Sequence, residues 1–260
     1  MLLMFGANSA QAQNSPALPF SPGEKLTYNV TWSVFPAGRV VATLVGPAKE
    51  NGTAYEVKTT ANSRGFVSLL YNVDDEFHSF FDPHTLCSER ITKRISEGHR
   101  HRLTEIKFDY AKKLAILDET DPTNPGARAK HDEKSIPDCV EDVVSAFYYL
   151  RRQPLQAGQK IKLALNDGSK TTEVVVEVQG QEQVQSGLGT RAALRVEPKI
   201  FGSLYHRKGR MLIWFSDDAQ HLPLRIKMML SFGSITGTLA SVAHAGEEEP
   251  PQDAVAPPSP

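Results

Sequence analysis

A strict alternation of apolar and polar side chains near the N-terminus is the feature that most constrains how this chain can fold. The apolar members are Leu26, Tyr28, Val30, Trp32 and Val34. Because successive side chains of a β-strand point to opposite faces, the pattern predicts a strand over residues 23–34 with one apolar and one polar face. An apolar face of this width must be covered by another sheet, by a helix or by a hydrophobic ligand.

Stretches with the same signature continue along the chain and are separated by turn-forming residues. The further predicted strands span residues 39–45, 55–59, 73–81, 86–95, 101–110, 114–118, 160–165, 172–178, 182–185, 191–196, 211–215, 224–230 and 235–242. Short turns such as Asn51-Gly52 favour antiparallel hairpins. Over residues 63–70 we expect a short helical turn or an apolar loop. Residues 119–137 are polar and rich in Pro and Gly, which predicts a long surface loop.

One stretch, residues 138–152, has the period of an amphipathic helix instead. Asp138 is a good N-cap with Glu141 three residues later, and Pro154 ends the pattern. The apolar residues at helical spacing are Val140, Val143, Val144, Phe147 and Leu150. A single helix of this kind usually covers an open face of a sheet. The predicted fold is mainly β, an antiparallel barrel-like or strongly curled sheet with one central or capping α-helix.

The length of 260 residues and the continuous strand pattern indicate a single β-rich domain over residues 20–242. Ahead of it, a short apolar run ends in a small-x-small box, so we interpret residues 1–12 as a remnant signal peptide without its positively charged start. The alternative is an ordinary cytosolic N-terminus. Residues 13–19 and the Pro- and Glu-rich tail, residues 243–260, are expected to be disordered. We therefore expect a periplasmic or otherwise exported protein of the cell envelope.

The chain has two cysteines, Cys87 and Cys139. In an exported protein an even number permits a disulfide, which would here join a strand to the start of the predicted helix. The alternative is two buried free thiols, which becomes the better interpretation if the N-terminal segment is not a leader.

The charges are balanced, since Lys and Arg number 29 and Asp and Glu number 30. No overall field attracts the chain to nucleic acid or to anionic lipid, and any basic surface would have to be local. Residues 99–102 are basic, but only two of the four share a strand face, which favours a solvated strand end. No apolar run approaches the roughly 18 residues of a membrane helix. We predict no nucleic-acid partner and no transmembrane segment.

Candidate catalytic and metal-binding residues lack the spacing that their chemistry requires. His78, Asp82, His84 and Cys87 are suitable zinc ligands by type, but no CxxC or HExxH pattern joins them, and a polar hairpin tip is the better interpretation. The residue types of a catalytic triad occur over residues 216–221 without a GxSxG turn. We predict no metal, no cofactor and no catalytic residues, and an envelope hydrolase is the least favoured reading.

Aromatic side chains are more informative. Tyr28, Trp32, Phe147 and Trp214 lie on predicted strands or on the predicted helix, where they are either ordinary core or the wall of a cavity. Our leading hypothesis is a non-enzymatic envelope protein that binds an apolar or amphiphilic, lipid-like ligand against these four residues. The alternative is a structural or scaffolding module that binds protein or glycan through an exposed strand edge.

Three ordered motifs extend across the chain. They are Phe20-x-Pro22-Gly23-Glu24-x-Leu26-x-Tyr28, Asp142-x-x-Ser145-Ala146-x-Tyr148-Tyr149-Leu150-Arg151, and Gly209-x-x-x-x-Trp214-x-Ser216-Asp217-Asp218 with Pro223-x-Arg225. Together they resemble an exported bacterial domain family of unknown function, and the resemblance covers residues 20–242. It implies a periplasmic, β-rich domain and no catalytic residues. More distantly, the expected plan is similar to that of bacterial carriers of lipoproteins and lipids, an analogy of architecture alone.

Overall fold

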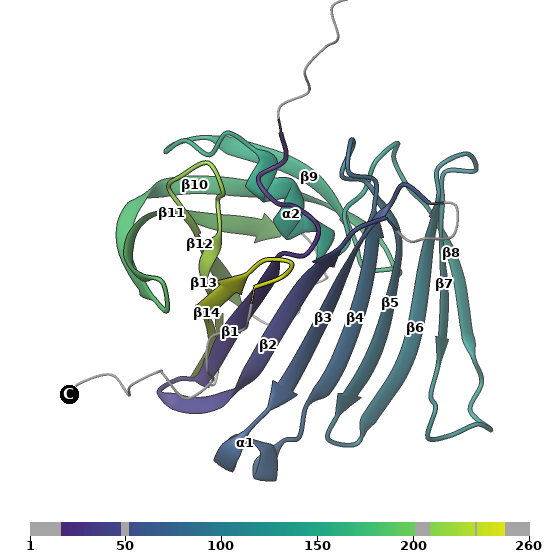
Figure 1. Ribbon diagram of the computed structural model, residues 1–260. Coiled ribbons are helices and arrows are strands. Elements are labelled where there is room, and N and C mark those ends of the chain that lie inside the picture. The colour runs from purple at the N-terminus through teal and green to yellow at the C-terminus, as the bar shows by residue number, and fades with distance from the viewer. Residues whose placement is uncertain (1–16, 48–51, 201–208, 232, 248–260) are drawn as a thin grey trace, which may run out of the picture.

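The computed structural model describes residues 17–47, 52–200, 209–231 and 233–247; the predicted leader and the tail beyond Glu247 lie outside these ranges. The described chain forms one strongly curled antiparallel sheet of fourteen strands with two short helices (Figure 1). The strands are β1 Lys25–Trp32, β2 Phe35–Val45, β3 Tyr55–Ser63, β4 Asp74–Phe81, β5 Ser88–Glu97, β6 Arg100–Asp109, β7 Leu114–Thr120, β8 Lys130–Ser135, β9 Lys160–Asn166, β10 Thr171–Ser186, β11 Gly189–Ile200, β12 Arg210–Ser216, β13 Pro223–Leu230 and β14 Gly233–Ala243. The predicted fold class is confirmed.

Strands that follow one another in the chain are neighbours in the sheet, as expected when short hairpin turns connect alternating segments. The exception is β8 and β9, which do not pair; instead β1 pairs with β14 near the two ends of the chain, so the sheet reads β8 to β1 and then β14 to β9. The two edge strands, β8 and β9, are therefore the strands on either side of helix α2, Ser145–Arg152.

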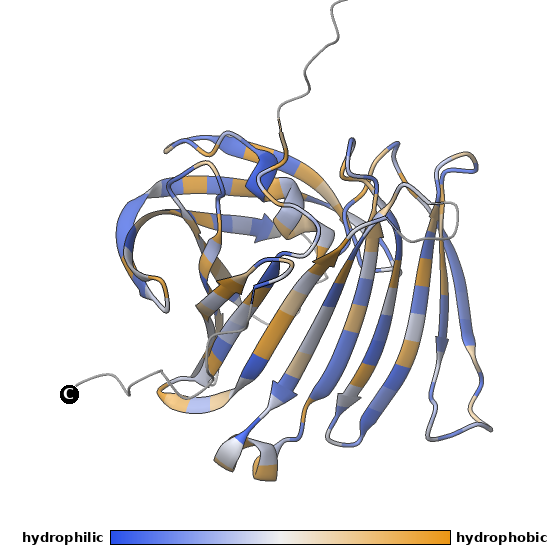
Figure 2. Cartoon of the chain, in the orientation of Figure 1, coloured by the Kyte–Doolittle hydropathy of each residue, from blue (hydrophilic) through white to orange (hydrophobic). Residues whose placement is uncertain are grey.

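The alternation in β1 directs one row of side chains to the inner side of the curled sheet. Leu26 and Tyr28 are buried there, and Tyr28 lies opposite Val40 of β2 and Leu239 of β14. Figure 2 shows the same alternation of apolar and polar residues across the neighbouring strands. The strand ends at Trp32, earlier than predicted, and Val34 lies in the following turn with 81% of its surface exposed.

The two halves of the sheet meet inside the curl. The turn between β9 and β10 packs onto β6 and β7, where a Cβ on Gly168 would lie 2.6 Å from Ile106 and 2.5 Å from Leu117. The segment before α2 forms a parallel bridge from Glu141 to Leu165 of edge strand β9. The turn can approach this closely only because residue 168 is a glycine, since a side chain there would clash with Ile106 and Leu117.

The helix starts later than the sequence pattern predicts. The backbone of Glu141 is engaged by β9, so the chain is still extended there, and Asp138 is exposed and caps nothing. The carboxylate of Asp142 accepts hydrogen bonds from the backbone N–H groups of Val144 at 2.7 Å and Ser145 at 3.1 Å. Asp142 is therefore the residue that caps α2, and the predicted capping box at Asp138 is wrong.

Two other boundaries differ from prediction. Residues 119–137 contain strand β8, whose side chains are mostly exposed because it is a sheet edge, so no apolar alternation marks it. Residues 172–185 form one continuous strand, since an irregularity between Val178 and Gly180 shifts the register without ending the pairing. Residues 63–70 contain the short helix α1, Gly65–Leu70. No helix in the described ranges is long and apolar enough to span a bilayer.

The disulfide is confirmed. Cys87 and Cys139 are bonded, with their Cα atoms 5.2 Å apart, so the chain just before β5 is joined to the segment that leads into α2. The bond closes a loop of 52 residues in sequence and fixes the helix segment against the first half of the sheet.

Candidate functional site

Two apolar cavities lie on the inner side of the sheet, one on each side of α2. The first cavity has a volume of about 270 Å³ and is bounded by α2 and strands β1, β2, β13 and β14. The second cavity, of about 320 Å³, lies between α2 and strands β9 to β12. Val143 and Phe147 line both. Each volume is near the lower end of the range for small-molecule sites.

The first cavity is open because residues at the centre of its wall have small side chains. Val30 of β1 and Ile226 of β13 both lie opposite Gly237 of β14, which has no side chain to fill the space between them. A Cβ on Gly237 would meet only atoms of Tyr28, at 3.9 and 4.0 Å. Ala42 of β2 is also small. The alternation therefore supplies an apolar wall, and small residues at its centre leave it unfilled.

One residue on the wall of this cavity, Tyr148, has a buried hydroxyl without a hydrogen-bond partner in the described chain. Burial raises the pKa of Tyr148, so the phenol stays neutral and can donate or accept. A buried hydroxyl left unpaired costs about 1–3 kcal/mol, which a ligand with a polar group would recover.

The charge beside this hydroxyl is already neutralised. Arg151 lines the same cavity and forms a bidentate ion pair with Glu24, with N–O distances of 2.5 and 2.8 Å, and both side chains are 1% exposed. Its other N–H groups donate to the backbone carbonyls of Pro19 and Gln220. The Arg151 side chain on the cavity wall therefore brings no unbalanced charge to the cavity.

The start of α2 is held by a buried cluster around Asp142. Its carboxylate accepts hydrogen bonds from the hydroxyls of Ser79 at 2.6 Å and Ser88 at 2.9 Å, and Ser88 also contacts the hydroxyl of Ser145 at 2.7 Å. Every member is fully buried. Because these bonds join β4, β5 and α2, the cluster positions the helix residues that line the cavities.

Glu141, next to this cluster, has an unusual environment. The residue is 3% exposed, and burial, reinforced by the charge of Asp142, raises the pKa of its carboxyl to about 7. Burial also lowers the pKa of Lys93, while Asp142 and Asp167 oppose that shift. Neither Glu141 nor Asp142 lines a cavity, so these groups bear on the position of α2.

Of the four residues predicted as a ligand wall, the structure brings two together. Tyr28 lines the first cavity and Phe147 lines both. Trp32 lies just beyond the wall: it is directly opposite Ile235, which lines the first cavity, on the neighbouring strand β14.

Trp214 lies elsewhere. Strand alternation turns it away from Ile213, which lines the second cavity, and its indole N–H donates to Glu182 at 2.8 Å. The β10–β11 hairpin, whose turn residue Gly187 bonds to the carbonyl of Leu239 on β14, helps to bury it. This tryptophan packs the sheet and lines neither cavity.

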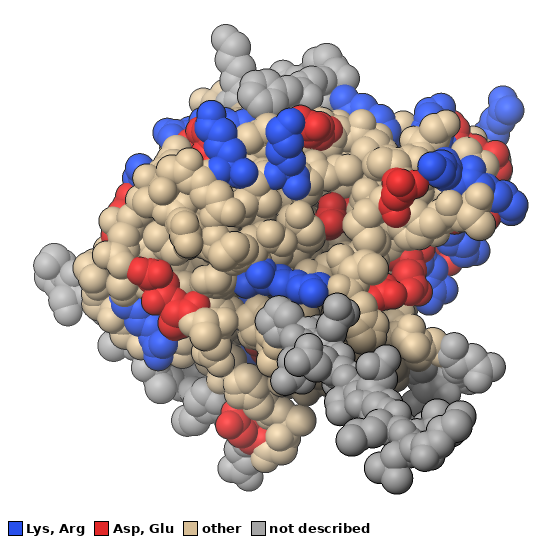
Figure 3. Space-filling model, turned by 90° about the horizontal axis from the view of Figure 1, so that it is seen from above, with Lys and Arg blue, Asp and Glu red and all other residues tan. Residues whose placement is uncertain are grey.

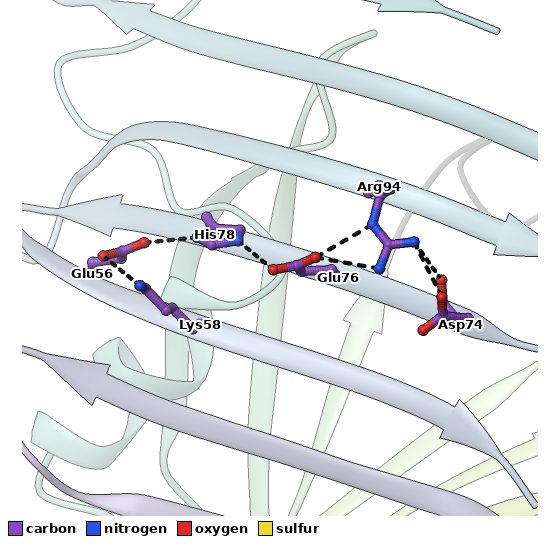
Figure 4. A network of polar contacts seen from close by, with 6 residues as sticks. All are labelled: Glu56, Lys58, Asp74, Glu76, His78 and Arg94. Carbon is purple, nitrogen blue, oxygen red and sulfur yellow. Dashed lines mark hydrogen bonds and ion pairs between the residues drawn. The ribbon is translucent and has the colours of Figure 1, made fainter. Parts of the chain in front are cut away.

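The residues considered for a metal lie on different surfaces. His78 is on the outer face of the sheet, in a row of charged residues along β3 to β5, where it contacts Glu56 at 2.7 Å and Glu76 at 2.9 Å (Figure 4). Asp82 accepts backbone hydrogen bonds in the turn that follows, and Cys87 is in the disulfide. Within the described ranges no three His, Cys, Asp or Glu side chains gather as a metal site would require.

The triad residue types near the C-terminus do not converge either. The hydroxyl of Ser216 donates to Asp218, while Nδ1 of His221 lies 2.8 Å from the carbonyl oxygen of Arg151. On the face seen in Figure 3, acidic and basic side chains are interspersed without a large patch of one sign.

Sequence reasoning missed several lining residues. No sequence pattern marks the second cavity or the unpaired hydroxyl of Tyr148. Which spaces stay unfilled and which polar groups stay unpaired depends on packing across the whole sheet. Val143 was recognisable as an apolar helix residue, yet it precedes the helix and is 39% exposed between the two cavities.

Comparisons with known proteins bear on the fold. A family model described as "Protein of unknown function (DUF3108)" matches residues 27–240. A search of curated protein sequences finds no significant match.

Among solved structures, a beta-barrel-like protein of a domain of unknown function, DUF1849, from Brucella abortus is similar with a TM-score of 0.58; it is 12% identical, and the match covers 85% of this chain and 97% of that one. A proposed exported protein with a YmcC-like fold from Bacteroides fragilis is 14% identical over 87% of this chain and 98% of its own, with a TM-score of 0.33. The first similarity supports the barrel-like fold, and the second is too weak to inform it.

Proposed function

The chain belongs to the DUF3108 family, whose function is unknown, and from that premise we propose that it is a non-enzymatic, exported cell-envelope protein that binds an amphiphilic, lipid-like ligand in the first cavity. The observation that carries the proposal is a first cavity whose wall surface is almost wholly apolar and which is lined by Tyr148, a residue whose buried hydroxyl has no partner in the described chain. An apolar chain would contact Val30 and Ile226, and a polar group would bond to the hydroxyl.

The absence of an unbalanced charge at Arg151 indicates the class of ligand. Because Glu24 neutralises Arg151, a ligand that brings a full charge would lose hydration without gaining a counter-charge. A hydroxyl, ester or amide group suits the Tyr148 hydroxyl better. We therefore favour a ligand whose buried polar group is uncharged.

The proposed compartment follows from the covalent structure. A disulfide between Cys87 and Cys139 is stable in oxidising compartments and rare in the cytosol, so it supports export. The buried carboxyl of Asp142 is engaged by serine hydroxyls and by helix N–H groups, which supports a structural role for this cluster in positioning α2.

A scaffold that recruits a partner by adding a strand is less well supported. Edge strand β8 has the sequence KHDEKS, and its charged, exposed side chains are of the kind that discourage edge pairing.

The proposal is tested by titrating the protein with 1-N-phenylnaphthylamine, whose fluorescence rises in apolar surroundings. Gly237→Leu should fill the first cavity without a backbone clash and abolish the signal. Gly180→Leu, also on a strand and with open space around its Cβ position, is the matched control and should bind as the wild type does. Equal uptake by both variants would contradict a site in the first cavity.

A further inference from the structure

Exposed apolar side chains concentrate at one end of the molecule. Of the nine large apolar residues that are exposed in the described chain, seven lie on the β1–β2 turn, on α1 and the residue after it, or at the start of β14. They are Val34, Phe35, Phe66, Leu69, Leu70, Tyr71 and Ile235. We call this set the apolar tip. Figure 2 shows the β1–β2 turn and α1 at the same end of the sheet.

Helix α1 has no structural reason to be apolar. None of its residues is buried, and Phe66 and Leu69 are 68% and 83% exposed. It is tied to the β1–β2 region because the N–H of Arg64 bonds to the carbonyl of Ala37. An exposed apolar segment of this kind is typical of a surface that contacts a membrane or another apolar partner.

The tip is continuous with the first cavity. Four apolar residues lie side by side on neighbouring strands. Trp32 of β1 lies between Phe35 of β2 and Ile235 of β14. Ile235 in turn lies opposite Met228 of β13. Residues directly opposite on neighbouring strands share a face, so these four form one apolar row. Ile235 and Met228 line the first cavity, and the row therefore runs from the cavity to the exposed end of the sheet.

Positive charge accompanies this surface. The tip segments 33–35, 64–72 and 98–100 contain Arg64, His99 and Arg100 but no carboxylate, in a chain that is otherwise balanced in charge. All three side chains are exposed, and the β5–β6 turn reaches the tip where a Cβ on Gly98 would lie 3.3 Å from Tyr71. The adjacent Glu97 is engaged by Arg100 at 3.4 Å.

We propose that the apolar tip docks onto a bilayer that contains anionic phospholipid. Phe66, Leu69 and Phe35 enter the interface between head groups and acyl chains, where an apolar surface needs no complementary shape. Arg64 lies where it meets lipid phosphates, and Arg100 is already paired with Glu97. The apolar row then connects the acyl region of the bilayer to the mouth of the first cavity.

The test is co-sedimentation of the full chain with vesicles of phosphatidylcholine alone or mixed with phosphatidylglycerol. We expect binding that is stronger to the mixed vesicles and that weakens with salt. Phe66→Ser combined with Leu69→Ser should lower the partition coefficient at least about tenfold. Its thermal unfolding should be unchanged, because both side chains are exposed.

Two further variants separate the contribution of the apolar side chains from that of the positive charge. Leu103→Ser removes a leucine that is 49% exposed but lies in the body of strand β6, and it should bind vesicles like the wild type. Arg64→Glu should reduce binding to the mixed vesicles much more than to phosphatidylcholine alone.

Three outcomes would overturn the proposal. The first is a wild type that binds neither kind of vesicle, and the second is a Phe66/Leu69 variant that binds as the wild type does. The third is a dimer, detected by light scattering, that Leu69→Ser dissociates. That result would assign the tip to a second copy of the chain. Uptake of 1-N-phenylnaphthylamine by the tip variants is a separate readout. The part of the uptake that Gly237→Leu removes reports on the first cavity, so failure of docking and failure of ligand binding are distinguishable.

Discussion

Arg151 and Glu24, 127 residues apart in sequence, form a bidentate ion pair inside the protein, and each side chain is only 1% exposed. The guanidinium also lies over the rings of Phe20 and Tyr148. A buried ion pair is tolerated when its hydrogen bonding is complete, and here each guanidinium nitrogen has an acceptor. This pair joins the N-terminal segment to α2.

Breaking the pair on one side should destabilise the protein strongly. Arg151→Met leaves the carboxylate of Glu24 buried without a counter-charge, and we expect a loss of about 3–5 kcal/mol in the free energy of unfolding. The double variant Glu24→Leu with Arg151→Met should recover much of this loss. Urea denaturation of the single and double variants measures both. A double variant no more stable than Arg151→Met would contradict this account.

The ion pair also brings together the three sequence motifs, which lie far apart in the chain. Glu24 comes from the first motif and Arg151 from the second, and the carbonyl of Gln220 that completes the site belongs to the turn after β12. That turn is held by the carboxylate of Asp218, from the third motif, which accepts the N–H of Gln220 at 2.9 Å. Three distant motifs therefore meet at α2, and their role is to hold the helix in the curl.

The stability of the protein should fall as the pH rises through neutrality because of Glu141. Its carboxyl has a pKa of about 7 in the folded protein against an ordinary value of 4.5, so the folded state binds the extra proton between these values. The stabilisation is fully present below about pH 4.5 and is lost as the pH rises through about 7, a change of about 3 kcal/mol. Glu141→Gln should remove this part of the pH dependence of urea unfolding. An unchanged pH profile in that variant would show that another group is responsible.

Removing the disulfide should weaken the attachment of the helix segment. Replacing both Cys87 and Cys139 by serine frees a loop of 52 residues, and loop-closure entropy predicts a loss of about 4 kcal/mol. Urea unfolding of the double serine variant, compared with the oxidised wild type, measures it. Coincident unfolding curves would mean that the bond adds nothing to the folded state.

The architecture could be predicted from sequence because alternation is a local signal. It identified β1 and the antiparallel hairpins, and it placed Tyr28 on an apolar face. The disulfide between Cys87 and Cys139 is predicted separately, from the even number of cysteines in a chain expected to be exported. The alternation does not predict the structure where tertiary contacts determine the secondary structure of a segment. Edge strand β8 is polar because nothing covers it, and the helix start moved from Asp138 to Asp142 because β9 captures the backbone of Glu141.

The site was less accessible to sequence reasoning. Trp32 and Trp214 look equivalent as strand tryptophans, yet one lies beside the first cavity and the other under the β10–β11 hairpin. The choice depends on how far each strand extends and on what folds over it. Gly237, whose missing side chain leaves the cavity open, is indistinguishable in sequence from any other strand glycine.

Tyr148→Phe should separate ligand binding from folding. Without ligand, loss of an unpaired buried hydroxyl should leave the free energy of unfolding unchanged or raise it by up to about 1 kcal/mol. The affinity for an amphiphilic ligand should fall roughly fivefold, the value of one hydrogen bond. Thermal unfolding of the ligand-free protein and displacement of 1-N-phenylnaphthylamine by added lipid measure the two effects. A destabilised ligand-free variant would mean that the hydroxyl has a structural partner.

The measurement that tests the central claim most directly is native mass spectrometry of the protein purified from its native cells, followed by organic extraction and lipid analysis. We predict a stoichiometric lipid-like molecule on the wild type and on Gly180→Leu, and none on Gly237→Leu. A wild-type protein that is free of ligand and takes up no added lipid would contradict the claim that the first cavity is a binding site.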